Sequence, residues 1–122
     1  MSKDLPAIQL SYDLAKEMLT RVAKFPRDHK FTLGDRIAER VLDVLESLLG
    51  AAYSKDKIAW LEKAHRRLEE VRMLLRLSRE LGPLSNQGYE HVMVMVTELG
   101  KQVVGWRKQA EKRLGQNVQE PV

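Results

Sequence analysis

Basic side chains crowd residues 55–81, a segment whose apolar positions repeat with helical period. Six of them are candidates for chemistry: His65, Arg66, Arg67, Arg72, Arg76 and Arg79. His65 and the last three arginines follow one another at spacings of seven, four and three residues, which places them in one stripe on a helix. Planar guanidinium groups suit phosphate and carboxylate, so the stripe favours binding of a nucleic acid or of an acidic protein.

The same segment also carries four glutamates: Glu62, Glu69, Glu70 and Glu80. Their helical spacing from the arginines allows ion pairs along the helix. An exposed face of paired charges is therefore the alternative to a binding stripe, and the spacing alone leaves both open.

Two further basic clusters lie outside this segment. The first surrounds a break in the helical pattern and consists of Arg21, Lys24, Arg27, His29 and Lys30. Within it, Arg27 and Lys30 are the candidates for phosphate binding. The second comes late in the chain, where the helix macrodipole already favours cations, and consists of Arg107, Lys108, Lys112 and Arg113. A net charge of +4 and a pI near 9.5 favour polyanionic partners for the chain as a whole.

Residue patterns typical of catalysis or of metal binding are not found in the sequence. The histidines His29, His65 and His91 share no metal-ligand spacing, and the chain has no cysteine. There is no glycine-rich phosphate loop, and Glu62 with His65 is the single Glu-x-x-His spacing, whereas a di-iron bundle carries two such pairs. We therefore expect no metal, no cofactor and no enzymatic activity.

Helical period divides the 122 residues into four segments joined by short breaks. The predicted helices span 6–23, 32–52, 55–81 and 85–113, and a polar tail follows at 115–122. Thr32 with Asp35, Ser54, and Ser85 or Asn86 are the expected N-terminal caps, whereas Gly82 and Pro83 end the third helix. The prediction is an all-α, single-domain protein folded as an antiparallel up-down-up-down four-helix bundle.

Apolar residues cover more of the second and fourth predicted helices than a bundle core requires. Their apolar arcs approach half of the circumference, against the ~100° that one core-facing stripe needs. Either self-association covers the surplus, or each helix buries a wide arc between its two neighbours. Gly50, Gly100 and Gly105 permit close helix approach or are merely tolerated. No apolar run approaches the ~20 residues of a membrane helix, so we expect no membrane contact, and the lack of cysteine fits a cytoplasmic protein.

The stretch "FPRDHKFTLGDRI" after the first helix, with "LESLLGAAY" and the ending "LGPLSNQGYEHVMVMVTELGKQVVGWRK", resembles the Avd family of diversity-generating retroelement accessory proteins. It resembles more loosely the four-helix proteins encoded in 23S rRNA intervening sequences. The matching motif positions are Phe25, Pro26, Arg27, Phe31, Leu33, Gly34 and Arg36. We expect Phe25, Phe31 and Leu33 to be structural, with Phe25 and Phe31 pinning the first connection to the bundle.

The resemblance implies a four-helix protomer that assembles into a barrel-like homopentamer with a positively charged surface. Its implied role is non-enzymatic: such proteins bind the retroelement's reverse transcriptase and template RNA, with DNA as a further candidate partner, and support mutagenic cDNA synthesis. The alternative is an RNA-associated protein of the rRNA intervening-sequence type. In those relatives the second helix ends in Asn-Ile-Ala-Glu-Gly, whereas residues 45–53 here read LESLLGAAY, which favours the Avd branch.

Overall fold

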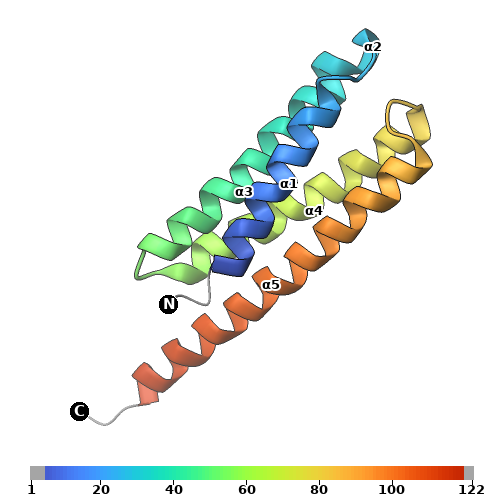
Figure 1. Cartoon of the computed structure of the whole chain (residues 1–122). Helices are drawn as coiled ribbons and strands as arrows, with labels where there is room; N and C mark the ends of the chain where they lie inside the picture. Colours follow the sequence, from blue (N-terminus) through green and yellow to red (C-terminus); the bar gives the residue numbers. More distant parts are fainter. Residues whose placement is uncertain (1–4, 120–122) are drawn as a thin grey trace.

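Four long helices make up most of the computed structural model, which describes residues 5–119. They are α1 (Leu5–Val22), α3 (Asp35–Tyr53), α4 (Lys57–Leu81) and α5 (Asn86–Gln119). A short helix, α2 (Arg27–His29), and a π-helical turn, η1 (Lys30–Gly34), connect α1 to α3. Figure 1 shows the long helices running alternately up and down, and the described residues contain no strand. The predicted all-α four-helix fold is confirmed.

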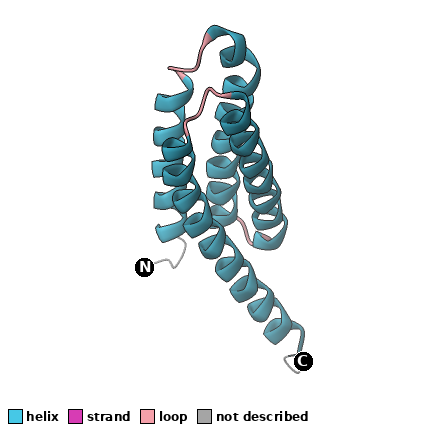
Figure 2. Ribbon diagram, turned by 90° about the vertical axis from the view of Figure 1, so that its right-hand side faces the viewer, coloured by secondary structure: helices cyan, strands magenta, loops and turns pink. Residues whose placement is uncertain are grey.

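The order of the helices around the bundle follows the order of the chain. α3 packs between α1 and α4, and α5 packs against α4 and returns to α1. α1 and α4 therefore occupy opposite corners. With 34 residues, α5 is about 51 Å long, against about 29 Å for the 19 residues of α3. Figure 2 shows the result: the C-terminal part of α5 continues beyond the end of the other helices.

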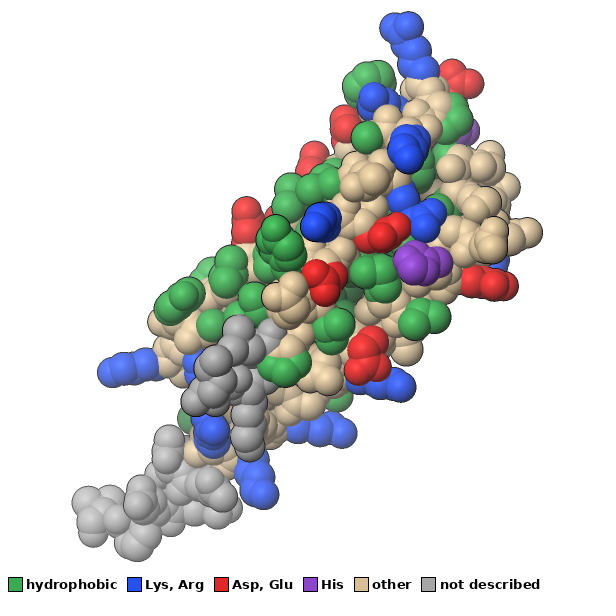
Figure 3. All heavy atoms as spheres, in the orientation of Figure 1, with side chains coloured by type: hydrophobic (Ala, Val, Ile, Leu, Met, Phe, Trp, Pro, Cys, Tyr) green, Lys and Arg blue, Asp and Glu red, His purple; other side chains and the backbone are tan. Residues whose placement is uncertain are grey.

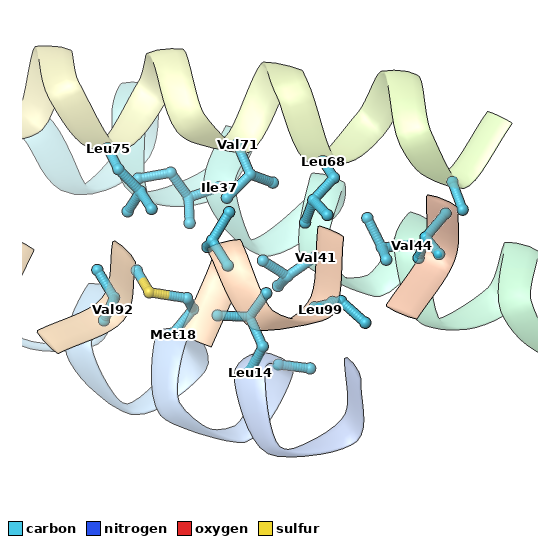
Figure 4. Close-up of a cluster of buried hydrophobic side chains, with 14 of the residues drawn as sticks. Leu14, Met18, Ile37, Val41, Val44, Leu68, Val71, Leu75, Val92 and Leu99 are labelled. Atoms are coloured by element: carbon cyan, nitrogen blue, oxygen red, sulfur yellow. The ribbon is translucent and has the colours of Figure 1, made fainter. Parts of the chain in front are cut away.

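Buried aliphatic side chains from all four helices form one core between them. On α3, Ile37, Val41 and Val44 recur at spacings of four and three, so the helix turns all of them inward. Figure 4 shows these side chains meeting residues of the other three helices. The labelled set is Leu14, Met18, Ile37, Val41, Val44, Leu68, Val71, Leu75, Val92 and Leu99. Full burial stabilises the fold by about 1.5–3 kcal/mol for each large aliphatic side chain.

After the first break the helical chain begins at Arg27, with Pro26 as the N-cap residue, and not at Thr32, so the predicted start and its cap were wrong. The carbonyl of Pro26 accepts hydrogen bonds from the backbone N–H groups of His29 and Lys30, both at 2.9 Å. As the N-cap residue, Pro26 has a non-helical ψ of 150°, while its carbonyl already accepts the first helical hydrogen bonds. The N–H of Asp35 already donates to the Lys30 carbonyl within η1, and the Thr32 hydroxyl donates to the His29 carbonyl at 3.4 Å. Thr32 therefore caps nothing.

Two other caps were predicted with different success. Ser54 does not cap α4, which begins at Lys57; its hydroxyl accepts a hydrogen bond from the Asp56 backbone in a tight turn. Ser85 does cap α5, because its hydroxyl accepts a hydrogen bond from the Gly88 N–H at 3.0 Å. Gly82 ends α4 as predicted, with a φ of 111° that disfavours other residues.

The last helix extends further than its predicted end at Arg113. α5 continues to Gln119, so most of the predicted polar tail is helical, and residues 120–122 lie outside the described part of the chain. Glu111 pairs with Arg107 one turn away at 3.6 Å, but the last turn of α5 holds no cation that would stabilise it through the macrodipole. The end of α5 is therefore helical although, in the described part of the chain, no other helix of the bundle packs against it.

Candidate nucleic-acid interface

The family-motif residues do not all behave as expected. Phe25 and Leu33 are buried, at 5% and 7% exposure, and hold the α1–α3 corner against the core as predicted. Phe31 is 66% exposed, so the prediction that it pins the connection was wrong. η1 turns Leu33 inward and leaves Phe31 in solvent, 6.0 Å from the Lys30 ammonium.

Pro26, Gly34 and Arg36, three other residues of the motif, lie in or next to the same connection between α1 and α3. Pro26 starts the helical turn, and Arg36 is exposed at the start of α3. Gly34 is buried beside Val22, but a Cβ there would lie 3.5 Å from the Val22 Cβ, an ordinary contact that alanine would also satisfy.

Arg67 faces the neighbouring helix α3 rather than solvent. Its Nε lies 3.3 Å from the Asp43 carboxylate, and its Nη1 donates to Glu70 at 2.9 Å. Arg40 of α3 approaches the same Glu70 at 2.7 Å. Two arginines and two carboxylates thus form one network across the α3–α4 contact, and Arg67 is occupied in it.

Glu70 lies at the centre of this network, and the two arginines around it change the pKa of its carboxyl group. Partial burial alone would raise the pKa of the Glu70 carboxyl, but the hydrogen bond and charge of Arg67, with the charge of Arg40, outweigh burial and lower it. Glu70 therefore stays ionised to lower pH than an isolated glutamate. The network is a structural ion-pair cluster that ties α4 to α3.

The remaining arginines of the stripe are also partnered. Arg72 pairs with Glu69 at 2.8 Å, and Arg76 donates to Glu80 at 3.0 Å. The Arg79 guanidinium lies 4.2 Å from the ring centre of Tyr89 on α5. These contacts match the alternative of a face of paired charges. Of the six candidate residues on α4, His65 and Arg66 have no ion pair within residues 5–119.

The cluster at the α1–α3 corner is more open. Arg27 is exposed and Lys30 half-buried, and neither has a carboxylate partner among the residues described. Arg21, by contrast, pairs with Glu17 at 2.6 Å. In Figure 1 the corner sits at the same end of the bundle as the α4–α5 connection. Arg27 and Lys30 therefore stay available to a phosphate.

The C-terminal part of α5 holds a third set of cations that sequence reasoning had left out of the site. They are Lys101, Arg107, Lys108, Lys112 and Arg113, accompanied between residues 101 and 115 by the single carboxylate of Glu111. All but Arg107 have no ion-pair partner in the described part of the chain. Residues 86–100 contain two glutamates and no lysine or arginine, and this segregation of charge was the signal in the sequence. We call residues 101–113 the basic end of α5.

A small groove separates the basic end of α5 from α4. Its walls are His65 of α4 and five residues of α5, namely Val103, Val104, Arg107, Lys108 and Glu111, and its volume is about 160 Å³. No cluster of three or more His, Cys, Asp or Glu side chains that could hold a metal ion occurs among the described residues.

Comparison with known families decides what kind of protein carries these surfaces. The model of the bAvd-like family matches residues 7–110. The chain belongs to the bAvd-like family. The match spans all four helices, so the resemblance seen in the sequence is confirmed. No curated protein matches this bAvd-like chain significantly.

A solved structure shows that the fold has been observed before. The crystal structure of a protein of unknown function from the S23 ribosomal protein family of Bacteroides thetaiotaomicron superposes on this bAvd-like chain with a TM-score of 0.81. The two share 19% sequence identity, and the match covers 88% of this chain and 99% of the other. At this identity the likeness concerns the fold alone.

Exposed apolar side chains lie on all four long helices of the bAvd-like bundle, including Val94 and Leu114 of α5. Leu42, Leu49 and Tyr53 form a ridge on α3, with Tyr53 90% exposed, and Tyr12 and Leu19 form one on α1. Figure 3 shows hydrophobic side chains following α3 and α1 along one side. A separate ridge on α4, at the opposite corner from α1, consists of Met73, Leu77 and Leu81. Between residues 5 and 119, no helix is long and apolar enough to cross a bilayer.

Proposed function

We propose that this chain is a non-enzymatic accessory protein of a diversity-generating retroelement. It binds the element's reverse transcriptase and its template RNA, and so supports mutagenic cDNA synthesis. The observation that carries the proposal is the bAvd-like family match over residues 7–110. The basic surfaces supply a physical basis, because cations without carboxylate partners release counterions when they bind phosphate.

The proposed assembly is a homopentamer, and the exposed apolar ridges support it. A closed ring of identical subunits uses two different faces of each subunit, one meeting the other on the next copy. The ridges on α1 and α3 supply one face, and Met73, Leu77 and Leu81 on α4 supply the other. Exposed apolar patches of this kind mark interaction surfaces when they are contiguous.

Binding of purified protein to its template RNA tests the proposal directly. We expect affinity to fall steeply as salt rises from about 50 to 200 mM, and light scattering to give a pentamer. A monomer without salt-sensitive RNA binding would contradict the proposal.

Capture of the reverse transcriptase separates the protein partner from RNA. We expect wild-type protein to capture the enzyme encoded beside it. Comparison with Arg72→Glu/Arg76→Glu then tests the α4 stripe, where both arginines are already paired with glutamates. Unchanged capture excludes the stripe from that contact.

The second candidate is an RNA-associated protein of the 23S rRNA intervening-sequence type. The specific observation that favours it is the fold shared with the S23-family protein, at a TM-score of 0.81. Genomic neighbours separate the two candidates. An adjacent reverse transcriptase gene and a pair of near-identical repeats belong only to a diversity-generating retroelement.

A further inference from the structure

We infer that the groove between α4 and α5, together with the basic end of α5, binds single-stranded RNA. One unstacked base enters the groove beside His65, and the phosphates on either side lie against Arg107, Lys108 and Lys112. The inference rests on the proposed RNA-binding function and assigns it to one end of the bundle.

The shape of the groove limits what it holds. Its volume of about 160 Å³ lies below the roughly 300–1,000 Å³ of pockets for drug-sized ligands and cofactors. Val104 is exposed at 39% and gives the groove an apolar wall, and the half-buried imidazole of His65 forms part of the opposite side. Apolar and aromatic surfaces of this kind stack on a single nucleic-acid base.

Arg107 supplies an unsatisfied donor at the edge of the groove. Its Nε is shielded from solvent and has no hydrogen-bond acceptor among the residues described. The nearest carboxylates are those of Glu111 at 3.6 Å and Glu62 at 3.9 Å, both too distant for a hydrogen bond. The Arg107 side chain as a whole is 38% exposed, and a phosphate oxygen that reaches its guanidinium would form a charge-assisted hydrogen bond.

Three lysines extend the cationic surface along the outside of α5. Lys101, Lys108 and Lys112 recur at spacings of seven and four, which places them on one face of the helix. The face runs about 16 Å along the helix axis. All three side chains are exposed and have no ion-pair partner within residues 5–119. The phosphates of an RNA strand that leaves the groove would lie against these three lysines.

The groove selects single-stranded RNA rather than a duplex. In a paired and stacked RNA helix the bases are not free to enter a side pocket, and proteins read such helices through backbone and shape. A narrow apolar groove next to a row of cations instead fits the pattern of single-strand binding, in which bases stack on side chains and phosphates follow a basic surface.

Fluorescence anisotropy with a short labelled uridine-rich RNA tests the cationic row. We expect Lys108→Glu/Lys112→Glu to weaken binding about tenfold or more and to reduce its salt dependence. Lys16→Glu/Lys55→Glu is the matched control, because both lysines are exposed and lack ion-pair partners in the described structure, and the change in net charge is the same. We expect it to weaken binding less than about threefold. Equal losses would overturn the inference, since binding would follow net charge alone.

Substitutions of His65 test the groove itself. We expect His65→Ala to weaken binding about fivefold or more, which is the lower range for loss of one stacked base, and His65→Phe to restore it. The same RNA annealed to its complement should bind more weakly than the single strand. Wild-type affinity in His65→Ala, or equal affinity for the duplex, would overturn the inference. Thermal melts and light scattering confirm that each variant keeps the fold and the assembly.

The failure of the inference is distinguishable from failure of the proposed function. If wild-type protein binds no RNA in a salt-dependent manner, the proposed function and the inference fall together. If wild type binds but the variants at the basic end of α5 bind equally well, only the inference falls. Loss of reverse transcriptase capture in Lys108→Glu/Lys112→Glu, with RNA binding unchanged, would also overturn it and identify the surface as a protein contact.

Discussion

α4 and the basic end of α5 are both rich in cations, yet the fold treats them in opposite ways. On α4, Arg67, Arg72 and Arg76 each meet a carboxylate within 3.3 Å. On α5, Lys108 and Lys112 have no such partner among the residues described. The density of basic residues in a segment is therefore a poor measure of the positive charge that it offers to a partner.

Position in the bundle explains the difference. α4 lies between α3 and α5, and it receives carboxylates both from its own turns and from Asp43 across the contact. The basic end of α5 packs against α4 on one side only, where Glu62 of α4 lies 3.9 Å from Arg107, and its lysines have no carboxylate partner among the described residues. Further along the chain α5 continues past the other helices, as Figure 2 shows. Surface ion pairs contribute little to stability, but they do reduce the local potential that attracts a polyanion.

The largest test of this contrast uses two glycines, one at the α3–α4 contact and one on the basic end of α5. A Cβ at Gly50 would lie 2.6 Å from the Trp60 indole, whereas a Cβ at Gly105 meets no described atom within 4 Å. We expect Gly50→Ala to lower the free energy of unfolding by about 1–2 kcal/mol, because overpacking outweighs the gain in helix propensity. Gly105→Ala should raise it by about 0.5–1 kcal/mol. Urea unfolding measures both.

The two glycine variants control for each other, since the chemical change is identical. Trp60→Leu gives a second check: in that background the ring no longer covers Gly50, so Gly50→Ala should become close to neutral. Stabilisation by Gly50→Ala in the wild-type chain would show that the helices do not pack through this glycine.

A second, smaller effect compares one cation from each region. Arg67→Ala should lower the free energy of unfolding by about 1 kcal/mol, because it leaves Asp43 and Glu70 facing each other across the α3–α4 contact without their shared partner. Lys108→Ala should change it by less than about 0.5 kcal/mol. Chemical denaturation resolves the difference. Equal effects would mean that the network on α4 contributes no more to stability than an unpaired surface lysine.

The sequence predicted those features that depend on one helix at a time. Apolar period located the core positions such as Ile37 and Leu75, and Gly82 marked the end of α4, because both signals act within a few residues. The start at Arg27 was missed because a π-helical turn interrupts the period and turns Phe31 outward. These errors are local and concern one connection.

The pairing of charges lies beyond such local signals. Arg67 meets Asp43 only because α3 and α4 pack in one register, which spacing along a single helix does not reveal. The availability of the cations on α5 likewise depends on where the other helices end. The predicted bounds 55–81 and 85–113 give the two neighbouring helices nearly equal lengths, and the charge cluster at the end of the last helix had a sufficient explanation in the macrodipole.

The smallest expected effect concerns the pH dependence of the α4 network. The pKa of Glu70 is lowered in the folded chain, so its stabilising contribution is complete above the pKa of the unfolded chain, about 4.3, and is lost as pH falls through the lower folded value. Glu70→Gln should therefore lose less stability than wild type on acidification from about pH 5 to 3. Because Glu70 is 42% exposed, we expect a difference of only about 0.5 kcal/mol or less.

Unfolding free energies measured by urea at several pH values give the comparison, with Lys108→Ala as the control from the basic end of α5. That control should keep the wild-type slope, because Lys108 has no carboxylate partner within the described residues. A Glu70→Gln slope identical to wild type would show that the arginines around Glu70 do not favour its charged form. The difference between the paired arginines of α4 and the unpaired lysines of α5 would then rest on interatomic distances alone. No energetic evidence would remain that ion pairing reduces the positive charge that α4 offers to RNA.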